Sequence, residues 1–339
     1  MRNRIRRIAL ALCALALLPA APARADDCAL KQMASLPLLD ASNTVIAVPV
    51  SINGSERAFE IDTGGVYSML NNDVAKDMGL DVKVVRDQQF YASDGTLLDK
   101  GVTIESLMIG RNEAKHIHLL LYPNFQNRQL AGTLAPDLLK LFDVDFDFAA
   151  RKLNLFSPDH CEGKVVYWAR DYVELPFTSP HRDDIRLEAT LDGHPLAAAL
   201  DTGTSRTTLL NSAAVQMFHL DAESPNSEKA EQPSLLLYRH RFDSLNLNGV
   251  AVNHLMVDVI ADAVEQSFHR RNASKADSDP IYGEPVDVPS LILGADVLRH
   301  LHLYIAYKER KLYVTAADAP PPAPAPPAAA PTSTAPPAH

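Results

Sequence analysis

Several features that would assign this chain to a familiar functional class are missing from it. Its 339 residues include 42 acidic and 32 basic residues, so no positive surplus exists to neutralise phosphates, which argues against DNA or RNA as a partner. No Gly-x-Ser-x-Gly, His-Glu-x-x-His, phosphate-binding loop or dinucleotide-binding motif occurs. The chain has three cysteines and no Cys-x-x-Cys pair, which disfavours a cysteine-based metal site. With 47% hydrophobic and 22% charged residues, the chain nevertheless has the composition of an ordinary globular protein.

The chain also lacks an apolar run of the roughly 20 residues that a membrane span needs. The apolar run at residues 8–18 follows four arginines and leads into an Ala/Pro-rich stretch that ends at Ala25. A basic start, a short apolar run and an Ala-x-Ala end predict a secretory signal peptide over residues 1–25. We therefore expect an exported protein, periplasmic or secreted, without a stable membrane anchor.

Export leaves the chain with few cysteines in an oxidising compartment. Cys13 is removed with the signal peptide, so Cys28 and Cys161 remain. Disulfides form and persist in such compartments, and we predict a disulfide between these two residues.

The middle of the chain contains two copies of one unit. Residues 48–75 align with residues 187–214 at an offset of 139, without a gap. Two further blocks align in the same order, at offsets of 138 and 159, and the surplus lies in a polar stretch that we interpret as a surface loop. The expected organisation is a signal peptide (1–25), an N-terminal segment (26–43), a first lobe (44–157), a connector (158–171), a second lobe (172–315) with a loop insertion (264–289), and a disordered Pro/Ala-rich tail (316–339).

Each copy contains mostly strand patterns. Apolar alternation around Asn53-Gly54 and Asp192-Gly193 predicts two hairpins. Short helices are expected after each hairpin, with Asn71 or Asn72 and Asn211 as N-caps, and again near Asp137 and Asp296. The residues therefore predict an all-β protein of two related lobes with few helices.

The triplet Asp-Thr-Gly occurs twice, at matched places in the two copies. The carboxylates are Asp62 and Asp201, and each follows an apolar strand. A symmetry axis between the copies can bring both carboxylates together, where they cannot both ionise cheaply and so share a proton. The ionised member can then take a proton from an attacking water, while the protonated member binds the peptide carbonyl oxygen. The glycines allow close approach of the backbone, and Thr63 and Thr202 can bond across the axis.

On these residues the chain resembles the aspartic proteases, specifically the bacterial exported retropepsin-like aspartyl proteases with two half-sites in one chain. The resemblance covers residues 44–315 and extends to the apolar-Gly element at residues 291–298, with a counterpart at residues 133–139. It implies an acid-protease fold of two pseudo-symmetric β-barrel lobes with a substrate cleft between them. It also implies an aspartic-type endopeptidase, a hydrolase, that needs no cofactor, takes a polypeptide substrate and works as a monomer. The residues carried over are the catalytic pair Asp62 and Asp201, the supporting loop residues Thr63, Gly64, Thr202, Gly203 and Thr204, and the flap residues Tyr91, Ser93, Asp94 and Gly95.

Two departures from the family pattern stand out. Gly65 lacks the hydroxyl that many members have beside the first aspartate, whereas Thr204 keeps it beside the second, so Asp201 is expected to be the better-stabilised anion. Ala135-Pro136 replaces the family glycine, and a side chain there could crowd the first catalytic loop. The alternative interpretation is therefore a catalytically weak or inactive protease-like protein that binds peptides in the cell envelope.

Histidine pairs are the other candidate for chemistry. His116 and His118, and likewise His300 and His302, would place two imidazoles on one strand face, a geometry that can hold a metal. No third ligand is identifiable from the sequence, and we predict no metal site.

Overall fold

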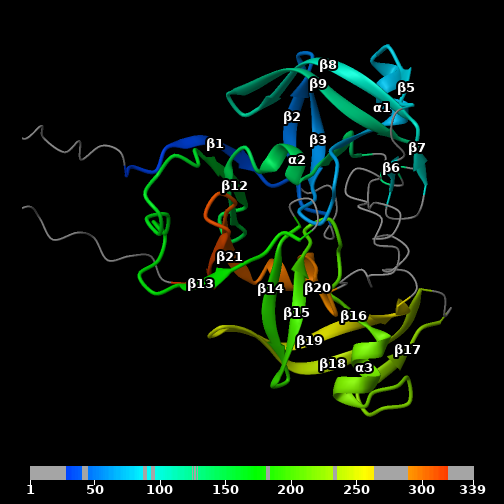
Figure 1. Cartoon of the computed structure of the whole chain (residues 1–339), viewed down its shortest axis with the longest axis vertical. Helices are drawn as coiled ribbons and strands as arrows, with labels where there is room; N and C mark the ends of the chain where they lie inside the picture. The colour runs from blue at the N-terminus through cyan, green and yellow to red at the C-terminus, as the bar shows by residue number, and fades with distance from the viewer. Residues whose placement is uncertain are drawn as a thin grey trace, which may run out of the picture.

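The structure of the chain, a computed structural model, describes residues 28–39, 45–86, 90–92, 96–123, 125, 127, 129–180, 184–231, 235–262 and 289–319. The predicted signal peptide (1–25) and nearly all of the predicted loop insertion (264–289) and tail (316–339) lie outside these residues. Strands account for 51% and helices for 9%, and the strands form two closed six-stranded barrels and a further sheet (Figure 1). The prediction of an all-β fold with two barrel lobes and a few short helices is confirmed.

The first barrel contains the first Asp-Thr-Gly triplet. Its ring runs, in spatial order, through β2 (Ala47–Ile52), β3 (Ser55–Ile61), β10 (Gly132–Leu134), β4 (Met69–Asn71), β9 (Asn112–Tyr122) and β8 (Lys100–Ile109). Pairing of β2 with β8 closes the ring, and β5 (Lys83–Val84) adds to the outer edge of β8. Alternate residues of β2 point into the barrel and are fully buried, as expected from the twofold side-chain period of a strand: Val48, Val50 and Ile52.

The second barrel repeats this order strand for strand. Its ring runs through β14 (Arg186–Leu191), β15 (His194–Leu200), β20 (Leu291–Leu293), β16 (Thr208–Leu210), β19 (Val250–Ile260) and β18 (Leu236–Leu247), and β17 (Ser227–Lys229) adds to β18. Pairing of β14 with β18 closes it. Two strand pairs in each barrel are parallel, β3–β10 and β4–β9 in the first and β15–β20 and β16–β19 in the second. The two barrels therefore share one topology.

A third sheet joins the lobes. Its order is β1 (Gln32–Pro37), β12 (Lys152–Phe156), β11 (Asp143–Asp147), β21 (Leu301–Ala306), β22 (Lys311–Ala316) and β13 (Val173–Pro176). The central pair, β11 and β21, brings together strands from the two copies of the repeat. In Figure 1 this sheet lies beside both barrels. The described N-terminal residues are thus part of a sheet, as its edge strand β1.

Unusual backbone conformations recur at matched positions of the two copies. Asn53 and Asp192 have φ of 48° and 43°, and the glycines that follow them have φ of 83° and 81°. His116 and His254, matched at the offset of 138, have φ of 53° and 56°. Non-glycine residues adopt this left-handed conformation at a cost in energy. Its recurrence at matched positions therefore indicates that the two copies share a backbone structure as well as sequence similarity.

Short helices follow the strands near each aspartate loop. They are α1 (Asn72–Asp77), α2 (Pro136–Leu139), α3 (Asn211–Phe218) and α5 (Ala295–Leu298). Asn71 is the N-cap of α1, as predicted, and its side chain accepts a hydrogen bond from the Asp73 N–H. The prediction of Asn211 as an N-cap is wrong, because Leu210 has that position and Asn211 is already helical. The carboxylate of Asp262 instead accepts a hydrogen bond from the Ser212 N–H in the first turn of α3.

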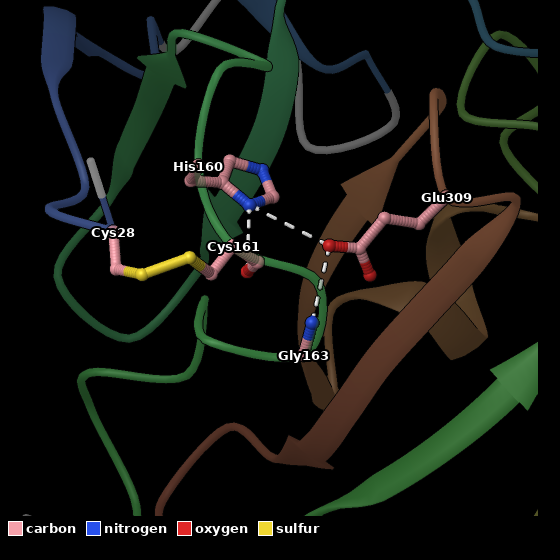
Figure 2. Close-up of a disulfide and its surroundings, with 5 residues drawn as sticks. All are labelled: Cys28, His160, Cys161, Gly163 and Glu309. Atoms are coloured by element: carbon pink, nitrogen blue, oxygen red, sulfur yellow. Dashed lines mark hydrogen bonds and ion pairs between the residues drawn. A yellow bond between two sulfur atoms is a disulfide. The ribbon is translucent and has the colours of Figure 1, made fainter. Parts of the chain in front are cut away.

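The predicted disulfide between Cys28 and Cys161 is present and ties the start of the described chain to the segment after β12 (Figure 2). Closing a loop over a sequence separation of 133 residues stabilises a fold by roughly 2–5 kcal/mol. Beside the disulfide, His160 Nε2 lies 2.5 Å from Asp143 Oδ2, and His160 Nδ1 lies 3.5 Å from Glu309 Oε1. Burial lowers the pKa of His160, but the hydrogen bonds to Asp143 and to the Cys161 carbonyl, together with the charges of Asp143 and Glu309, outweigh it, so the net direction is upward.

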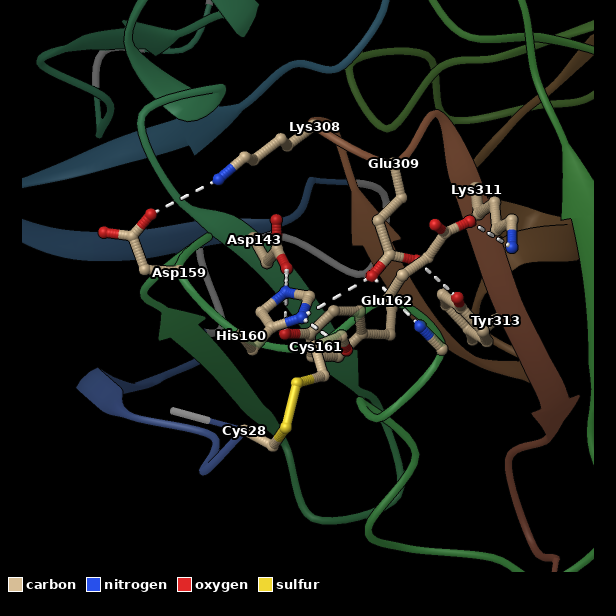
Figure 3. A network of polar contacts seen from close by, with 12 residues as sticks. Cys28, Asp143, Asp159, His160, Cys161, Glu162, Lys308, Glu309, Lys311 and Tyr313 are labelled. Carbon is tan, nitrogen blue, oxygen red and sulfur yellow. Dashed lines mark hydrogen bonds and ion pairs between the residues drawn. A yellow bond between two sulfur atoms is a disulfide. The ribbon is translucent and has the colours of Figure 1, made fainter. Parts of the chain in front are cut away.

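Figure 3 shows how this network spans the shared sheet. Asp143 belongs to β11, whereas Glu309 lies in the turn between β21 and β22 and accepts hydrogen bonds from the Gly163 N–H and the Tyr313 hydroxyl. A protonated His160 therefore bridges carboxylates from both copies of the repeat.

One hydrophobic cluster extends through both barrels and the shared sheet, and a smaller cluster packs around Tyr304 and Tyr313. The lobes are thus held together by apolar packing as well as by strand pairing. Within the described chain, none of the helices has the length and apolar character required to cross a membrane.

Candidate active site

Each Asp-Thr-Gly triplet lies directly after a strand that a parallel partner supports. The Asp62 N–H donates a hydrogen bond to the Leu134 carbonyl at 2.9 Å, and the Asp201 N–H donates one to the Leu293 carbonyl at 3.1 Å. Leu134 ends β10 and Leu293 ends β20, which run parallel to β3 and β15. The same local architecture therefore directs both aspartates toward the junction of the lobes.

The two threonines of the triplets form a reciprocal set of hydrogen bonds across that junction. The Thr63 N–H donates to Thr202 Oγ1 at 3.1 Å, and the Thr202 N–H donates to Thr63 Oγ1 at 3.0 Å. Each hydroxyl also donates onward, Thr63 to the Leu200 carbonyl and Thr202 to the Ile61 carbonyl. Both threonines are buried, so these bonds are formed away from water and fix the two loops relative to each other.

This arrangement brings the two aspartate side chains into contact. Gly64 lies against Asp201 and Gly203 lies against Asp62, so both carboxyl groups occupy the same junction, where they do not both ionise cheaply. Burial, the charge of Asp201 and the charge of Glu60 raise the pKa of Asp62 well above its ordinary value, against a lowering contribution from the Gly65 N–H. Gly65 N–H donates to Asp62 Oδ1 at 2.7 Å, and Gly203 N–H donates to Asp201 Oδ1 at 2.8 Å.

The two loops need glycine where their backbone passes close to the aspartate carboxylates. A Cβ added to Gly64 would lie 2.3 Å from Asp201 Cγ, and one added to Gly203 would lie 2.5 Å from Asp62 Oδ1. Each glycine therefore contacts the aspartate of the opposite lobe. A Cβ added to Gly65 would lie 2.5 Å from Asp62 Oδ2, so this loop has no room for a side chain there.

A hydroxyl and a second carboxylate support each loop from behind. In lobe 1 the Ser68 hydroxyl donates to Asp137 Oδ1 at 2.6 Å and accepts from the Ala135 N–H at 2.9 Å. In lobe 2 the Thr207 hydroxyl donates to Asp296 Oδ1 at 2.8 Å and accepts from the Gly294 N–H at 3.1 Å. The repeat alignment matched Asp137 with Asp296, but the sequence alone did not indicate the hydroxyls as their partners.

The Ala135-Pro136 departure has a definite structural consequence. Ala135 is fully buried, and the Asp62 backbone bond to Leu134 is as short as its lobe 2 counterpart, so the methyl group does not displace the first loop. Pro136, however, has no N–H. Its lobe 2 counterpart, Ala295, donates a hydrogen bond to the Thr204 carbonyl at 2.8 Å. Lobe 1 therefore lacks one backbone hydrogen bond that fixes the Asp201 loop in lobe 2.

Of the remaining predicted site residues, Thr204 is half-buried and its hydroxyl donates to the Arg206 carbonyl at 3.4 Å. Tyr91 lies in the hairpin of β6 (Phe90–Tyr91) and β7 (Leu97–Leu98), whose base rests against Tyr67 through an edge-on contact with Phe90. The other predicted flap residues, Ser93, Asp94 and Gly95, lie outside the described residues.

One residue near the aspartates had no signal in the sequence. Glu60 lies on β3 two residues before Asp62, and its pKa is raised to about 7 by burial and by the charge of Asp201. Because its counterpart in the second copy is Ala199, the repeat alignment did not single it out.

The histidine pairs do not converge. His300 lies in the turn before β21, not on the predicted strand face, and His302 is buried with Nε2 2.7 Å from Asp145 Oδ1. His116 is exposed beside Glu105, and His118 lies beside the Thr103 hydroxyl. In the part of the chain that the structure describes, no group of three or more His, Cys, Asp or Glu side chains has a metal-binding arrangement.

Comparison with protein families adds an independent finding. Residues 48–137 match the model of the aspartyl protease family. The matched range begins in β2, contains the first Asp-Thr-Gly triplet and ends in α2, and it confirms the resemblance that the sequence motifs indicated. At the level of the family, the match supports a hydrolase of the aspartic protease type. A comparison with curated proteins finds no match.

Proposed function

We propose that the chain is an aspartic endopeptidase that hydrolyses peptide bonds with a water molecule activated by Asp62 and Asp201. The observation that carries the proposal is the contact between the two carboxyl groups, held by the reciprocal Thr63–Thr202 bonds. Two carboxyls that share one proton supply both a base for the water and an acid for the carbonyl oxygen.

The surroundings of the pair support different roles for its two members. The raised pKa of Asp62 favours its protonated form, so Asp62 is the acid that donates to the carbonyl oxygen of the scissile bond. Asp201 then carries the negative charge and takes a proton from the water that attacks the carbonyl carbon. Asp201 then gives its proton to the leaving amine nitrogen, while Asp62 takes a proton from a hydroxyl of the tetrahedral intermediate; the carbon–nitrogen bond breaks and the proton is back on Asp62.

The polypeptide substrate would lie extended across the pair, under the hairpin of β6 and β7 that contains Tyr91. Both half-sites belong to one chain, so a monomer suffices. The disulfide fits an oxidising compartment, and together with the signal-like residues 1–25 it supports export to the periplasm or the exterior.

The test is cleavage of an unfolded protein by the full chain at acidic pH. Asp62→Asn and Asp201→Asn should each abolish cleavage, because a dyad with one amide can no longer exchange the shared proton. Asp77→Asn, which changes an exposed carboxylate at the end of α1, is the matched control and should cleave normally.

Cleavage that survives both active-site substitutions would overturn the proposal. Peptide binding without cleavage by the unmutated chain would also overturn it, and would favour the alternative of a protease-like peptide-binding protein of the cell envelope.

A further inference from the structure

A third carboxylate lies next to the aspartate pair on the lobe 1 side. Glu60 lies on β3, and Asp62 directly follows the last residue of that strand. Two residues of extended chain separate their Cα atoms by about 7 Å and direct both side chains to the same face. The alternating residues Phe59 and Ile61 are fully buried inside the barrel, which sets Glu60 on the outward face with Asp62. Glu60 itself is half-buried.

The neighbours of Glu60 across the sheet do not neutralise it. On β2 its partner is Ala47, and on β10 its partner is Thr133, so both flanking positions on this face are uncharged. Thr133 is buried, and its hydroxyl has no hydrogen-bond partner in the structure. Among the described residues, none forms a salt bridge or a hydrogen bond with the Glu60 carboxylate.

Burial and the charge of Asp201 make the ionised form of Glu60 unfavourable. Burial first, and then the charge of Asp201, raise the pKa of Glu60, and the Glu60 charge in turn raises the pKa of Asp62. An ionised carboxylate in such surroundings is stabilised most effectively by a cation that approaches from outside the protein.

The matched position in lobe 2 differs in the residue itself and in both of its neighbours across the sheet. Ala199 stands in place of Glu60, and its parallel partner is Ile292 in place of Thr133. On the other side, lobe 2 has Arg186, but this residue is buried and its guanidinium lies 2.6 Å from Asp184. The charge in lobe 2 is therefore paired within the protein, whereas the charge in lobe 1 is not.

We propose that the Glu60 carboxylate binds a cationic side chain, lysine or arginine, of the polypeptide substrate, at the residue that lies on the lobe 1 side of the scissile bond. The proposal rests on the proposed peptidase function and makes the preference one-sided, because Ala199 offers no carboxylate on the other side. A lysine side chain adjacent to the scissile bond is long enough to reach the carboxylate of a residue whose Cα lies about 7 Å from that of Asp62. The ammonium group replaces the countercharge that the protein does not supply.

The test compares peptides that carry lysine or its uncharged analogue norleucine at each of the two residues flanking the scissile bond. Above the Glu60 pKa of about 7, kcat/KM for the lysine peptide should exceed that for the norleucine peptide about tenfold at one of these positions only. Acidification protonates Glu60, so the ratio should approach one below that pKa. Glu60→Gln and Glu60→Ala should both reduce the ratio to one at every pH.

Two controls separate a specific effect from a structural one. Glu56→Gln removes a charge from the exposed start of the same strand and should leave the lysine preference intact. Glu60→Ala introduces the residue that lobe 2 has at the matched position, and thermal unfolding monitors whether each variant is folded. The readout is a ratio, so a general loss of activity in a variant cancels.

The outcomes distinguish this inference from the proposed function. Equal kcat/KM for lysine and norleucine peptides at both positions, or a lysine preference that persists in both Glu60 variants, would overturn the inference while leaving the peptidase intact. If no peptide is cleaved above the Glu60 pKa, calorimetric binding of the same peptides at that pH decides: a lysine preference that Glu60→Gln removes supports cation binding by Glu60, whereas equal binding of the lysine and norleucine peptides overturns it. The peptidase itself is tested separately, by the cleavage assay at acidic pH.

Discussion

At the position two residues before the aspartate, lobe 1 has Glu60 and lobe 2 has Ala199, although the strands that carry them are matched along their length. The bonds that hold the loops are conserved between the lobes: aspartate to strand end, threonine to threonine, and hydroxyl to supporting carboxylate. The charges around them are not. The comparison indicates that the symmetric elements position the pair, whereas the unsymmetric ones determine how its two members differ.

A second difference between the lobes lies at the residue that follows the strand supporting each aspartate loop, β10 in lobe 1 and β20 in lobe 2. Lobe 2 has Gly294 where lobe 1 has Ala135, and a Cβ added to Gly294 would lie 2.4 Å from the Arg206 carbonyl carbon. The glycine permits a closer approach of strand end to loop in lobe 2, together with the Ala295 to Thr204 backbone bond. The second loop therefore has a closer backbone contact behind it, and one more backbone hydrogen bond, than the first.

The largest expected effect comes from the symmetric part of the site. Gly64→Ala and Gly203→Ala each introduce a Cβ against the aspartate of the opposite lobe, which pushes the two carboxyls apart. A displacement of this kind should lower kcat/KM by at least about 100-fold in either variant. Cleavage assays on the folded variants measure it, with Asp77→Asn, which changes an exposed side chain at the end of α1, as the control.

Equal losses of kcat/KM in the two glycine variants would support the conclusion that the symmetric elements of the two lobes position the aspartate pair. A severe loss in one variant beside near-normal cleavage in the other would contradict it, and would mean that only one of the two close contacts matters for catalysis.

The next effect concerns the unequal support of the loops. Gly294→Ala forces a methyl group against the backbone of Arg206 and should destabilise the fold by about 1–3 kcal/mol. The converse change, Ala135→Gly, removes a buried methyl that the lobe already accommodates and should cost about 1 kcal/mol. Urea unfolding of both variants gives the two free energies. Similar values for the pair would show that the two loops are packed alike.

Much of this architecture could be predicted from the sequence because the repeat fixes it locally. The hairpins around Asn53-Gly54 and Asp192-Gly193, the mostly β content and the Cys28–Cys161 disulfide all follow from short patterns or simple counting. The predicted roles of Asp62 and Asp201 remain proposals, but the symmetry argument correctly anticipated that the structure brings them together.

The sheet that joins the lobes could not be predicted in the same way. Its strands were visible as apolar runs before Arg151 and Arg310, but the pairing of β11 with β21 joins residues more than 150 positions apart, such as Val144 and Ile305. No local pattern specifies such a partner. Glu60 escaped notice for a related reason, since its importance comes from the charges that folding places around it rather than from its neighbours in the chain.

The smallest expected effect isolates the charge of lobe 1 without requiring catalysis. Glu60 has an ordinary pKa of 4.5 in the unfolded chain and about 7 in the folded one, so between these pH values the folded chain holds a proton that the unfolded chain has released. The free energy of unfolding must then fall as the pH rises through this window. Glu60→Gln removes the difference in proton binding and should make the stability in this window less dependent on pH, whereas Glu56→Gln should not. Urea unfolding at several pH values measures both slopes. An unchanged slope in Glu60→Gln would mean that Glu60 ionises as freely in the folded protein as in water, and the contrast between a charged lobe 1 and a neutral lobe 2 would then have no energetic consequence at this position.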